Sequence, residues 1–193
     1  MTPQTRARWK VVVIVEDDTD GRALRSLATA AGLGLDVDWL PANGIGNIKR
    51  RCAELIVLAN GRVRPGEGCV AVVVDRDGKD ASRDQPHRSI AQACRASDTP
   101  YLEAVEAFEA WALADPGVAA WLDLKVKGQT DRIVKPKKRV SDAFLKKAGR
   151  TFHKRRARLQ LVDHATGIQP STSPSWDRVV DLAARCPTSG DAD

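Results

Sequence analysis

The chain has 193 residues, of which 42% are hydrophobic and 29% are charged, and its formal net charge is +6. These values lie close to ordinary globular usage and argue against a disordered or fibrous protein. No stretch approaches the roughly 18 to 20 uncharged residues that a membrane span requires, and the apolar run near the N-terminus stops at Glu16, too early for a signal peptide. We expect one soluble, cytoplasmic domain without membrane association.

The positive charge is concentrated in one segment. Between Leu124 and Gln160 the sequence holds 14 Lys or Arg residues against two Asp residues, a net charge of +12, so the rest of the chain carries −6. This split indicates an acidic part that could bind a metal ion and a basic part that could bind a polyanion, since Lys and Arg gain affinity by displacing phosphate counterions. A solvated helical face is the alternative for a charge run by itself.

The cysteines predict neither a structural zinc site nor a disulfide framework. Cys52, Cys69, Cys94 and Cys186 lie far apart, without the close pairing that gives zinc its tetrahedral ligands. Since nothing marks secretion, a reducing compartment is the simpler interpretation. We therefore expect buried thiols in a cytoplasmic protein.

The first 116 residues alternate between strand and helix patterns. Continuous apolar runs at 10–15 and 69–74 and an alternating run at 35–40 predict three strands. Unbroken apolar runs are typical of strands buried on both faces of a parallel sheet, so helices must cover both sides. The other predicted elements are a helix at 20–31 with Asp17, Asp18 and Thr19 as candidate caps, a helix ending near Asn60, a polar loop at 75–86 followed by a helix ending at Ala96, a fourth strand at 99–107 and a helix at 108–114.

The pattern changes after Pro116, where helices joined by basic loops are predicted. We therefore expect an α/β core at 8–116, a basic and mainly helical extension at 117–186 that packs on the core, and a tail at 187–193. The helix breaks are expected at Gly128, Pro136, Gly149 and 170–175.

Acidic side chains follow the first and third predicted strands. Glu16 comes directly after the first strand, and Asp75 and Asp77 come directly after the third. Ligands of a parallel α/β sheet bind at the carboxyl ends of the strands, so these three side chains should meet at one edge. Clustered carboxylates repel one another and need a cation, and oxygen ligands favour Mg²⁺ or Mn²⁺. The sequence thus predicts a divalent-metal site. For Asp-x-Asp alone, a pair of solvated loop aspartates is the alternative.

These motifs resemble a known family. Val-Ile-Val-Glu-Asp-Asp-Thr-Asp-Gly at 13–21 and Val-Val-Val-Asp-Arg-Asp at 72–77 resemble the glutamate and Asp-x-Asp motifs of the Toprim fold. That fold is shared by topoisomerases, bacterial primases, and the overcoming-lysogenization-defect (OLD) and small-RNA-maturation nucleases. The segment 106–116 resembles the Glu-x-Trp-hydrophobic-Leu-Ala-Asp segment of the DUF4276 group of Toprim-like proteins. Lys-Pro-Lys at 135–137 and the segment 173–182 also resemble that group.

The resemblance implies a Toprim-like, Rossmann-like α/β fold with a mostly parallel sheet and flanking helices. It also implies that Glu16 is the acid/base carboxylate, that Asp75 and Asp77 hold Mg²⁺ or Mn²⁺, and that Glu109 supplies a further acidic group. The sequence departs from the motif at Asp17, where many Toprim proteins have glycine. The complete set of predicted metal ligands is Glu16, Asp20, Asp75, Asp77 and Glu109.

Together these features predict a metal-dependent nuclease that hydrolyses phosphodiester bonds of DNA or RNA, in phage defence or nucleic-acid processing. Glu16 would move the proton, and Lys135, Lys137 or Lys138 would neutralise the transition state. The alternative class is a non-catalytic Toprim-like protein that binds nucleic acid or regulates an ABC-type ATPase, as the resemblance to components working beside such ATPases implies. The predicted nucleic-acid-binding residues are Lys135, Lys137, Lys138, Arg139, Lys146, Lys147, Lys154, Arg155 and Arg156.

Two other families share parts of these motifs. Val-Glu-Asp-Asp at 15–18 also resembles the start of a response-regulator receiver domain, but Asp75 lies further along than a phosphoacceptor should. Asp-Arg-Asp-Gly at 75–78 resembles the first motif of haloacid-dehalogenase phosphatases, which usually open with that strand, whereas here it is the third. Both families therefore fit the sequence less well.

The histidines and two of the tryptophans have simpler interpretations. His87, His153 and His164 are scattered in polar surroundings, which predicts surface residues or phosphate contacts. Trp111 and Trp121 are ten residues apart, close to three helical turns, which predicts core anchors.

Overall fold

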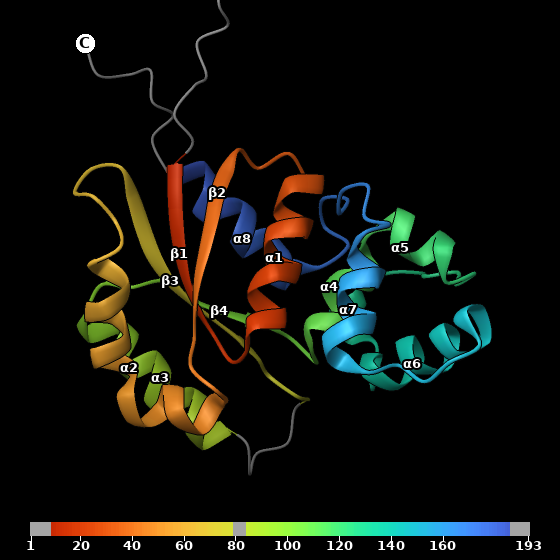
Figure 1. Ribbon diagram of the computed structural model, residues 1–193, viewed down its shortest axis with the longest axis horizontal. Coiled ribbons are helices and arrows are strands. Elements are labelled where there is room, and N and C mark those ends of the chain that lie inside the picture. Colours follow the sequence, from red (N-terminus) through yellow and green to blue (C-terminus); the bar gives the residue numbers. More distant parts are fainter. Residues whose placement is uncertain (1–8, 79–83, 186–193) are drawn as a thin grey trace, which may run out of the picture.

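The computed structural model describes residues 9–78 and 84–185. Within these ranges four strands form an all-parallel sheet in the order β2-β1-β3-β4, as Figure 1 shows. The mostly parallel sheet expected from the apolar runs is thereby confirmed. The strands are β1 (Trp9–Val15), β2 (Leu35–Pro41), β3 (Gly68–Asp75) and β4 (Tyr101–Ala104).

The register of the sheet aligns the ends of the two central strands. Ile14 of β1 pairs with Val72 of β3, and Asp75 of β3 pairs with Ala104 of β4. Because all strands run in the same direction, Glu16 after β1 and Asp75 at the end of β3 reach the same carboxyl edge.

Helices cover both faces of the sheet, and the alternation of side chains along β1 divides the core between them. Val11, Val13 and Val15 belong to one buried cluster, whereas Val12 and Ile14 belong to the other, because successive side chains of a strand point to opposite faces. The first cluster includes side chains of α1 (Asp18–Ala30), α4 (Phe108–Ala114) and α8 (Pro174–Arg185), and the second includes those of α2 (Ile45–Asn60) and α3 (Asp84–Ala96).

The remaining helices lie beside the sheet (Figure 1), and their side chains form a third buried cluster together with residues of α4. Phe144 and Leu161 are fully buried there, packed with side chains of α4 and α5. The extension therefore shares α4 with the sheet, and α1 packs against α7. The elements of this part are α5 (Pro116–Trp121), the 3₁₀ helix η2 (Thr130–Arg132), α6 (Pro136–Ala148) and α7 (Lys154–Val162).

Hydrogen bonds of two buried residues, Trp111 and Asp115, connect α4 and α5 to the C-terminal segments. The fully buried Trp111 of α4 donates a hydrogen bond from Nε1 to Ser175 Oγ at 2.7 Å, which satisfies its polar group. Asp115, also fully buried, accepts hydrogen bonds from the backbone N–H groups of Gly117, Thr166 and Gly167 at 2.7–3.0 Å. These bonds fix the position of α4 relative to the helices that follow it.

Trp39 of β2 packs directly on the backbone of α1. A Cβ added at Gly21 would lie 2.2 Å from Cγ of Trp39, so only glycine fits there. The indole also donates from Nε1 to Asp18 at 2.9 Å, and the guanidinium of Arg25 lies 4.3 Å from the ring centroid.

Several predicted boundaries and environments are corrected by the structure. The fourth strand covers only Tyr101–Ala104 of the expected 99–107, because Glu106 has a φ of 66° and turns the chain out of the extended conformation. The first helix begins at Asp18 instead of Asp20, since Asp17 forms its N-cap and accepts hydrogen bonds from Thr19 and Asp20.

The prediction that the histidines lie at the surface is wrong for His87. It is buried and forms a hydrogen bond with the Tyr101 hydroxyl at 2.8 Å. Trp111 is confirmed as a core residue, whereas Trp121 is half-buried and stacks on His164 at 4.4 Å. Cys52 and Cys94 are buried thiols as predicted, with their sulfur atoms 3.9 Å apart, whereas Cys69 is only half-buried. Cys186 lies outside the described residues. No helix in the described part of the chain is long and apolar enough to cross a membrane.

Candidate functional site

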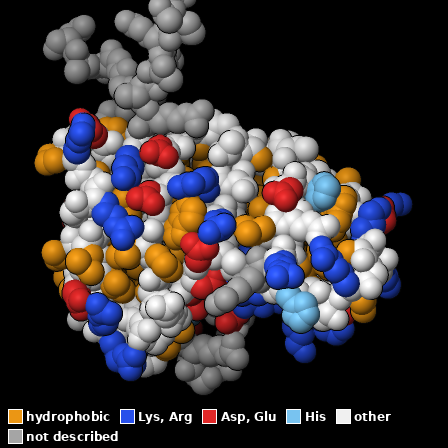
Figure 2. Space-filling view, viewed as in Figure 1, with side chains coloured by type: hydrophobic (Ala, Val, Ile, Leu, Met, Phe, Trp, Pro, Cys, Tyr) orange, Lys and Arg blue, Asp and Glu red, His pale blue; other side chains and the backbone are white. Residues whose placement is uncertain are grey.

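Acidic side chains from four elements lie at the carboxyl edge of the sheet. Glu16 follows β1, Asp75 ends β3 and Asp77 lies two residues further on; Asp20 and Glu109 come from the first turns of α1 and α4. In Figure 2 acidic side chains gather at this edge, below the start of α1. The five predicted metal ligands are thus brought to one region of the molecule.

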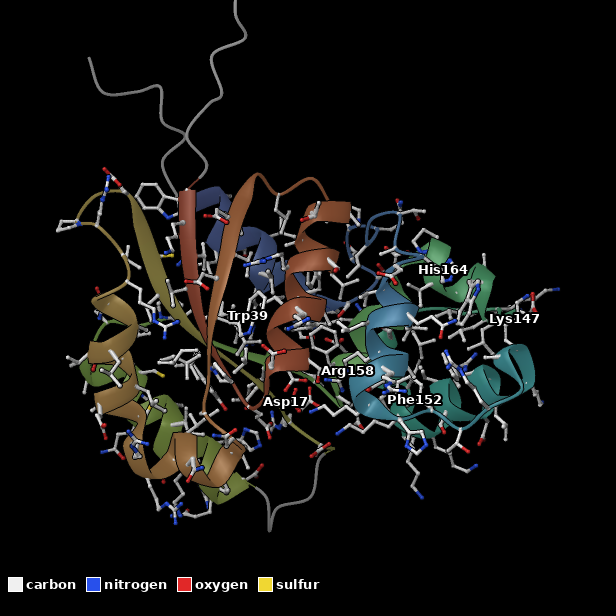
Figure 3. The ribbon with its side chains drawn as sticks, in the orientation of Figure 1. Asp17, Trp39, Lys147, Phe152, Arg158 and His164 are labelled. Atoms are coloured by element: carbon white, nitrogen blue, oxygen red, sulfur yellow. The ribbon has the colours of Figure 1, made fainter. Side chains whose placement is uncertain are left out.

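A buried arginine holds two of these carboxylates together. Arg158 of α7 is 1% exposed and donates hydrogen bonds to Asp20 and, over 2.6 Å, to Glu109. Its Nη2 atom also lies 3.9 Å from Asp75 Oδ2, and its guanidinium packs 4.9 Å from the centroid of the Phe108 ring. Figure 3 shows Arg158 of α7 on the side of that helix that faces α1. Arg158 therefore connects α1, α4 and β3.

Two lysines approach the same cluster from the solvent side. Lys137 of α6 forms ion pairs with Asp77 and, at 3.3 Å, with Asp75. Lys154 of α7 forms ion pairs with Asp17 at 2.5 Å and with Asp20 at 3.2 Å. The cluster of carboxylates is thus partly neutralised by side chains of the basic extension.

The ionisation of Glu16 is shifted more than that of an ordinary surface carboxyl. Burial, followed by the nearby charges of Asp75 and Asp20, raises its pKa to about 7, although Lys154 and a backbone hydrogen bond from Asp75 act in the opposite direction. Burial also raises the pKa of Asp20, in spite of Arg158. A carboxyl with a pKa near neutrality can both accept and donate a proton at physiological pH.

Burial and the neighbouring carboxylates shift the pKa of the basic side chains of the site in opposite directions. Burial lowers the pKa of Lys137, but the charges of Asp75, Asp77 and Glu109 outweigh burial and raise the pKa above its ordinary value. The carboxylates of Glu109, Asp75 and Asp20 likewise raise the pKa of the buried Arg158 guanidinium against the effect of burial. Both side chains are permanently charged at neutral pH.

The position of Asp75 is fixed by the chain that follows β4. Its Oδ1 atom accepts a hydrogen bond from the Phe108 backbone N–H at 2.8 Å, at the start of α4. Between the two aspartates, Arg76 forms ion pairs with Asp84 at 3.4 Å and with Glu103 at 3.8 Å. Asp75 is therefore held by the start of α4, and Arg76 is held by carboxylates of α3 and β4.

A cavity of about 1060 Å³ opens beside Asp77 and Lys137. Three of its lining residues, Asp77, Glu106 and Lys135, have φ angles of 50°, 66° and 54°, in the left-handed region that non-glycine residues seldom adopt. Backbone strain of this kind concentrates at functional sites. The cavity also exposes Lys138, so it offers basic side chains next to the acidic cluster.

The donor set fits a hard divalent ion in its chemistry. Glu16, Asp75 and Asp77 supply only carboxylate oxygens, and the buried Oε2 atom of Glu109 has no hydrogen-bond partner among the described residues. In the part of the chain that the structure describes, however, no three Asp, Glu, His or Cys side chains are grouped closely enough to enclose an ion. Lys137 instead forms ion pairs with two of the predicted ligands, Asp75 and Asp77. The metal ion stays a prediction.

The predicted nucleic-acid-binding residues lie at three different places. Lys135, Lys137 and Lys138 line the cavity beside Asp77, and Lys154 joins the acidic cluster. The side chain of Arg155 lies outside the described part of the structure, and Arg156 is exposed. A separate cavity of about 400 Å³ is lined by Arg139, Lys146 and Lys147.

Arg158 is the residue of this site that the sequence prediction missed. It lies in a run of basic residues, which is usually a solvated face, so nothing in its type indicated burial. One signal was available: Arg158 follows Lys154 by four residues, which places both on the same side of a helix.

Comparisons with known proteins bear on the fold. No protein-family model matches the sequence, and no curated protein matches it. The structure is similar to a solved structure of the C-terminal region of the Burkholderia pseudomallei OLD protein, with a TM-score of 0.50 and 17% sequence identity over 90% of this chain and 96% of that chain. At this identity the likeness concerns the fold alone. The chain is therefore an α/β protein with an all-parallel four-stranded sheet between helices, and its fold is similar to that of this region of an OLD protein.

Proposed function

We propose that the protein is a Toprim-type nuclease that hydrolyses phosphodiester bonds of DNA or RNA with the help of Mg²⁺ or Mn²⁺. The observation that carries this proposal is the meeting of Glu16 and Asp75 at the carboxyl ends of adjacent strands, with the pKa of Glu16 raised to about 7. The resemblance of the motifs to the DUF4276 group supports a cytoplasmic role in phage defence or nucleic-acid processing.

Glu16, Asp75 and Asp77 would hold the divalent ion. Such an ion, when bound, activates water and stabilises negative charge on a phosphate. Glu16 would take up a proton on its carboxylate oxygen and return it, which its pKa allows near neutral pH. Lys137, already placed against Asp75 and Asp77, would bring positive charge to the scissile phosphate.

The cavity beside Asp77 would receive the nucleic-acid strand. Lys135 and Lys138 line it without belonging to the acidic cluster, so they are suited to bind backbone phosphates. Replacing both by Ala should weaken the dependence of log affinity on log salt concentration, by roughly 0.7 to 0.9 for each phosphate that the protein no longer neutralises. An unchanged slope would assign these lysines to a solvated face.

The test of catalysis is cleavage of labelled single- and double-stranded DNA and RNA by the purified chain in Mn²⁺. Glu16→Gln should reduce the rate by about a hundredfold to ten-thousandfold while leaving affinity for the nucleic acid within a few fold. The matched control is Glu67→Gln, at an exposed carboxyl before β3, which should cut at the wild-type rate. Cleavage by Glu16→Gln at the wild-type rate would contradict the assignment of Glu16.

A second candidate function is a binding protein that regulates an ABC-type ATPase without cutting. It is favoured by one observation: Arg158, Lys154 and Lys137 already form ion pairs with the acidic cluster, which is how a purely structural cluster would be neutralised. Binding of nucleic acid without cleavage of any of the four substrates in Mg²⁺ or Mn²⁺ would favour this second function.

A further inference from the structure

Two of the cysteines are in contact in the core between α2 and α3. Cys52 of α2 and Cys94 of α3 are 3% and 1% exposed, and their Sγ atoms lie 3.9 Å apart. The two helices pack side by side on one face of the sheet (Figure 1). Each cysteine lies on the buried side of its helix, with Ile48 and Ile56 one turn on either side of Cys52 and Ile90 one turn before Cys94. The contact between the thiols is therefore fixed by helix packing.

Cys69 is kept apart from this contact by the sheet. It lies on β3 and packs against the other buried cluster, whereas the next residue, Val70, belongs to the cluster of Cys52 and Cys94. Successive side chains of a strand point to opposite faces, so the sheet separates Cys69 from the pair. Among the residues that the structure describes, Cys52 and Cys94 are thus the two cysteines placed to react with each other.

The two sulfur atoms need only a small movement to form a bond. The S–S length of a disulfide is about 2.05 Å, so the sulfur atoms would approach each other by about 2 Å, shared between two side chains. The backbone of α2 can adjust at this point, because Arg51, directly before Cys52, has a φ of −122° and a ψ of 18°, outside the helical range. The turn that carries Cys52 can therefore shift without disrupting a regular helix.

A small oxidant has a route to the pair. Cys94 lines a cavity of about 530 Å³ together with Tyr101 and Leu182, a volume many times the roughly 30 Å³ that a water molecule occupies in the liquid. The hydrogen bond between the two thiols lowers the pKa of Cys52 and, together with burial, raises the pKa of Cys94. Cys52 is thus the thiol that more readily supplies the thiolate, which is the form that attacks a peroxide.

We propose that Cys52 and Cys94 form a reversible disulfide when the folded protein is exposed to a peroxide, so that the pair is an oxidation site within the core. The Cys52 thiolate attacks one oxygen atom of hydrogen peroxide, the O–O bond breaks, hydroxide leaves, and Cys52 becomes a sulfenic acid. Cys94 then attacks the Cys52 sulfur atom, the S–S bond forms, and the sulfenic oxygen leaves as water with the thiol proton. Two thiols are oxidised and one peroxide is reduced to two water molecules.

This site is independent of the proposed nuclease activity. It uses residues of α2 and α3 on one face of the sheet and none of the residues of the acidic cluster. A reducing thiol reverses the bond by exchange, so the pair can stay as two thiols in a reducing compartment and become linked when the oxidant concentration rises. The linked form joins α2 to α3 covalently.

The test is treatment of the folded, reduced protein with hydrogen peroxide, followed by denaturation in N-ethylmaleimide, digestion with trypsin and mass spectrometry. Cleavage after Arg and Lys places Cys52 in the peptide 52–62 and Cys94 in the peptide 89–95. These peptides should appear joined, with a mass two hydrogen atoms below their sum, and dithiothreitol should separate them. The oxidised protein should also melt roughly 5 to 10 °C higher, because the bond closes a long loop in the unfolded chain.

Matched variants identify the partners. Cys52→Ser and Cys94→Ser should each abolish the joined peptide and the rise in melting temperature. Cys69→Ser combined with Cys186→Ser leaves only the two thiols of the pair and should preserve both effects. The wild type carries the main measurement, so the test does not depend on whether the serine variants in the core fold.

Three results would overturn the proposal. Recovery of the two peptides only as separate maleimide adducts or sulfinic acids would show that the sulfur atoms do not bond in the folded protein. A bond from Cys52 or Cys94 to Cys69 or Cys186 would show that the contact between α2 and α3 opens. A joined peptide in a protein that melts no higher than the reduced form would show that the bond forms at the expense of native packing.

Discussion

The raised pKa of Glu16 predicts a pH-dependent cost to stability that one substitution removes. The carboxyl has a pKa of about 7 in the folded protein against an ordinary value of 4.5. Between these values the folded state holds a proton that the unfolded state has lost, so stability falls as pH rises from about 4.5 to 7. At about 1.4 kcal/mol for each tenfold change in proton affinity, the upper limit is roughly 3 kcal/mol.

We expect the effect to be smaller because Glu16 is only half-buried. Solvent screening reduces the expected gain of Glu16→Gln to about 1 to 2 kcal/mol at pH 8 without divalent ions, and to near zero at pH 4.5, where the wild-type carboxyl is protonated in the folded state. Urea unfolding at both pH values, in the presence of a chelator, measures this difference directly.

A control substitution and the addition of Mg²⁺ give two further measurements of stability. Glu67→Gln, at an exposed carboxyl, should change the free energy of unfolding by the same small amount at pH 4.5 and pH 8. If the protein binds the metal ion as proposed, Mg²⁺ at pH 8 should stabilise the wild type more than Glu16→Gln, because the ion would bind the folded state through the ionised Glu16 carboxylate. A Glu16→Gln variant that is less stable than the wild type at pH 8, or whose advantage does not change with pH, would refute the reasoning.

Two further substitutions test the packing that supports the site. In thermal unfolding, Gly21→Ala should destabilise the protein by about 1 to 3 kcal/mol, since its Cβ would lie 2.2 Å from Cγ of Trp39. The control Gly46→Ala, whose Cβ would have no atom within 4 Å, should be neutral or slightly stabilising. Equal effects of the two substitutions would contradict the clash with Trp39. Asp115→Asn should lower the free energy of unfolding in urea by about 2 to 4 kcal/mol, because the buried carboxylate accepts hydrogen bonds from several backbone N–H groups. The control Asp163→Asn, at an exposed carboxyl, should change it little. An Asp115→Asn variant as stable as the wild type would refute the structural role of these hydrogen bonds.

The parallel sheet could be predicted from sequence because its strands are buried on both faces. The apolar runs at 10–15 and 69–74 leave no polar face, and such runs are typical of strands covered by helices. The end of β4 could not be predicted in the same way. Val105, Glu106 and Ala107 include no glycine or proline that would mark the end of a strand, and it is the left-handed conformation of Glu106 that turns the chain away.

The site was predictable where it depends on chain order along the sheet. Glu16 and Asp75 follow directly from the carboxyl ends of parallel strands, which the topology brings together. The role of Arg158 could not be predicted, because its burial depends on how α7 packs against α1, a contact between distant parts of the chain. His87 was missed for a related reason: its partner Tyr101 lies on a different element.

The link between Arg158 and Asp20 has a consequence for folding, because 138 residues separate the two. During synthesis the strands and the carboxylates of the acidic edge leave the ribosome well before α7, so the edge is repulsive until the last third of the chain arrives. Closing so long a loop carries an entropic cost and slows the final step. The sheet and the basic helices should therefore fold as one cooperative unit, and a chain that ends after α5 should be less stable than its apolar core suggests.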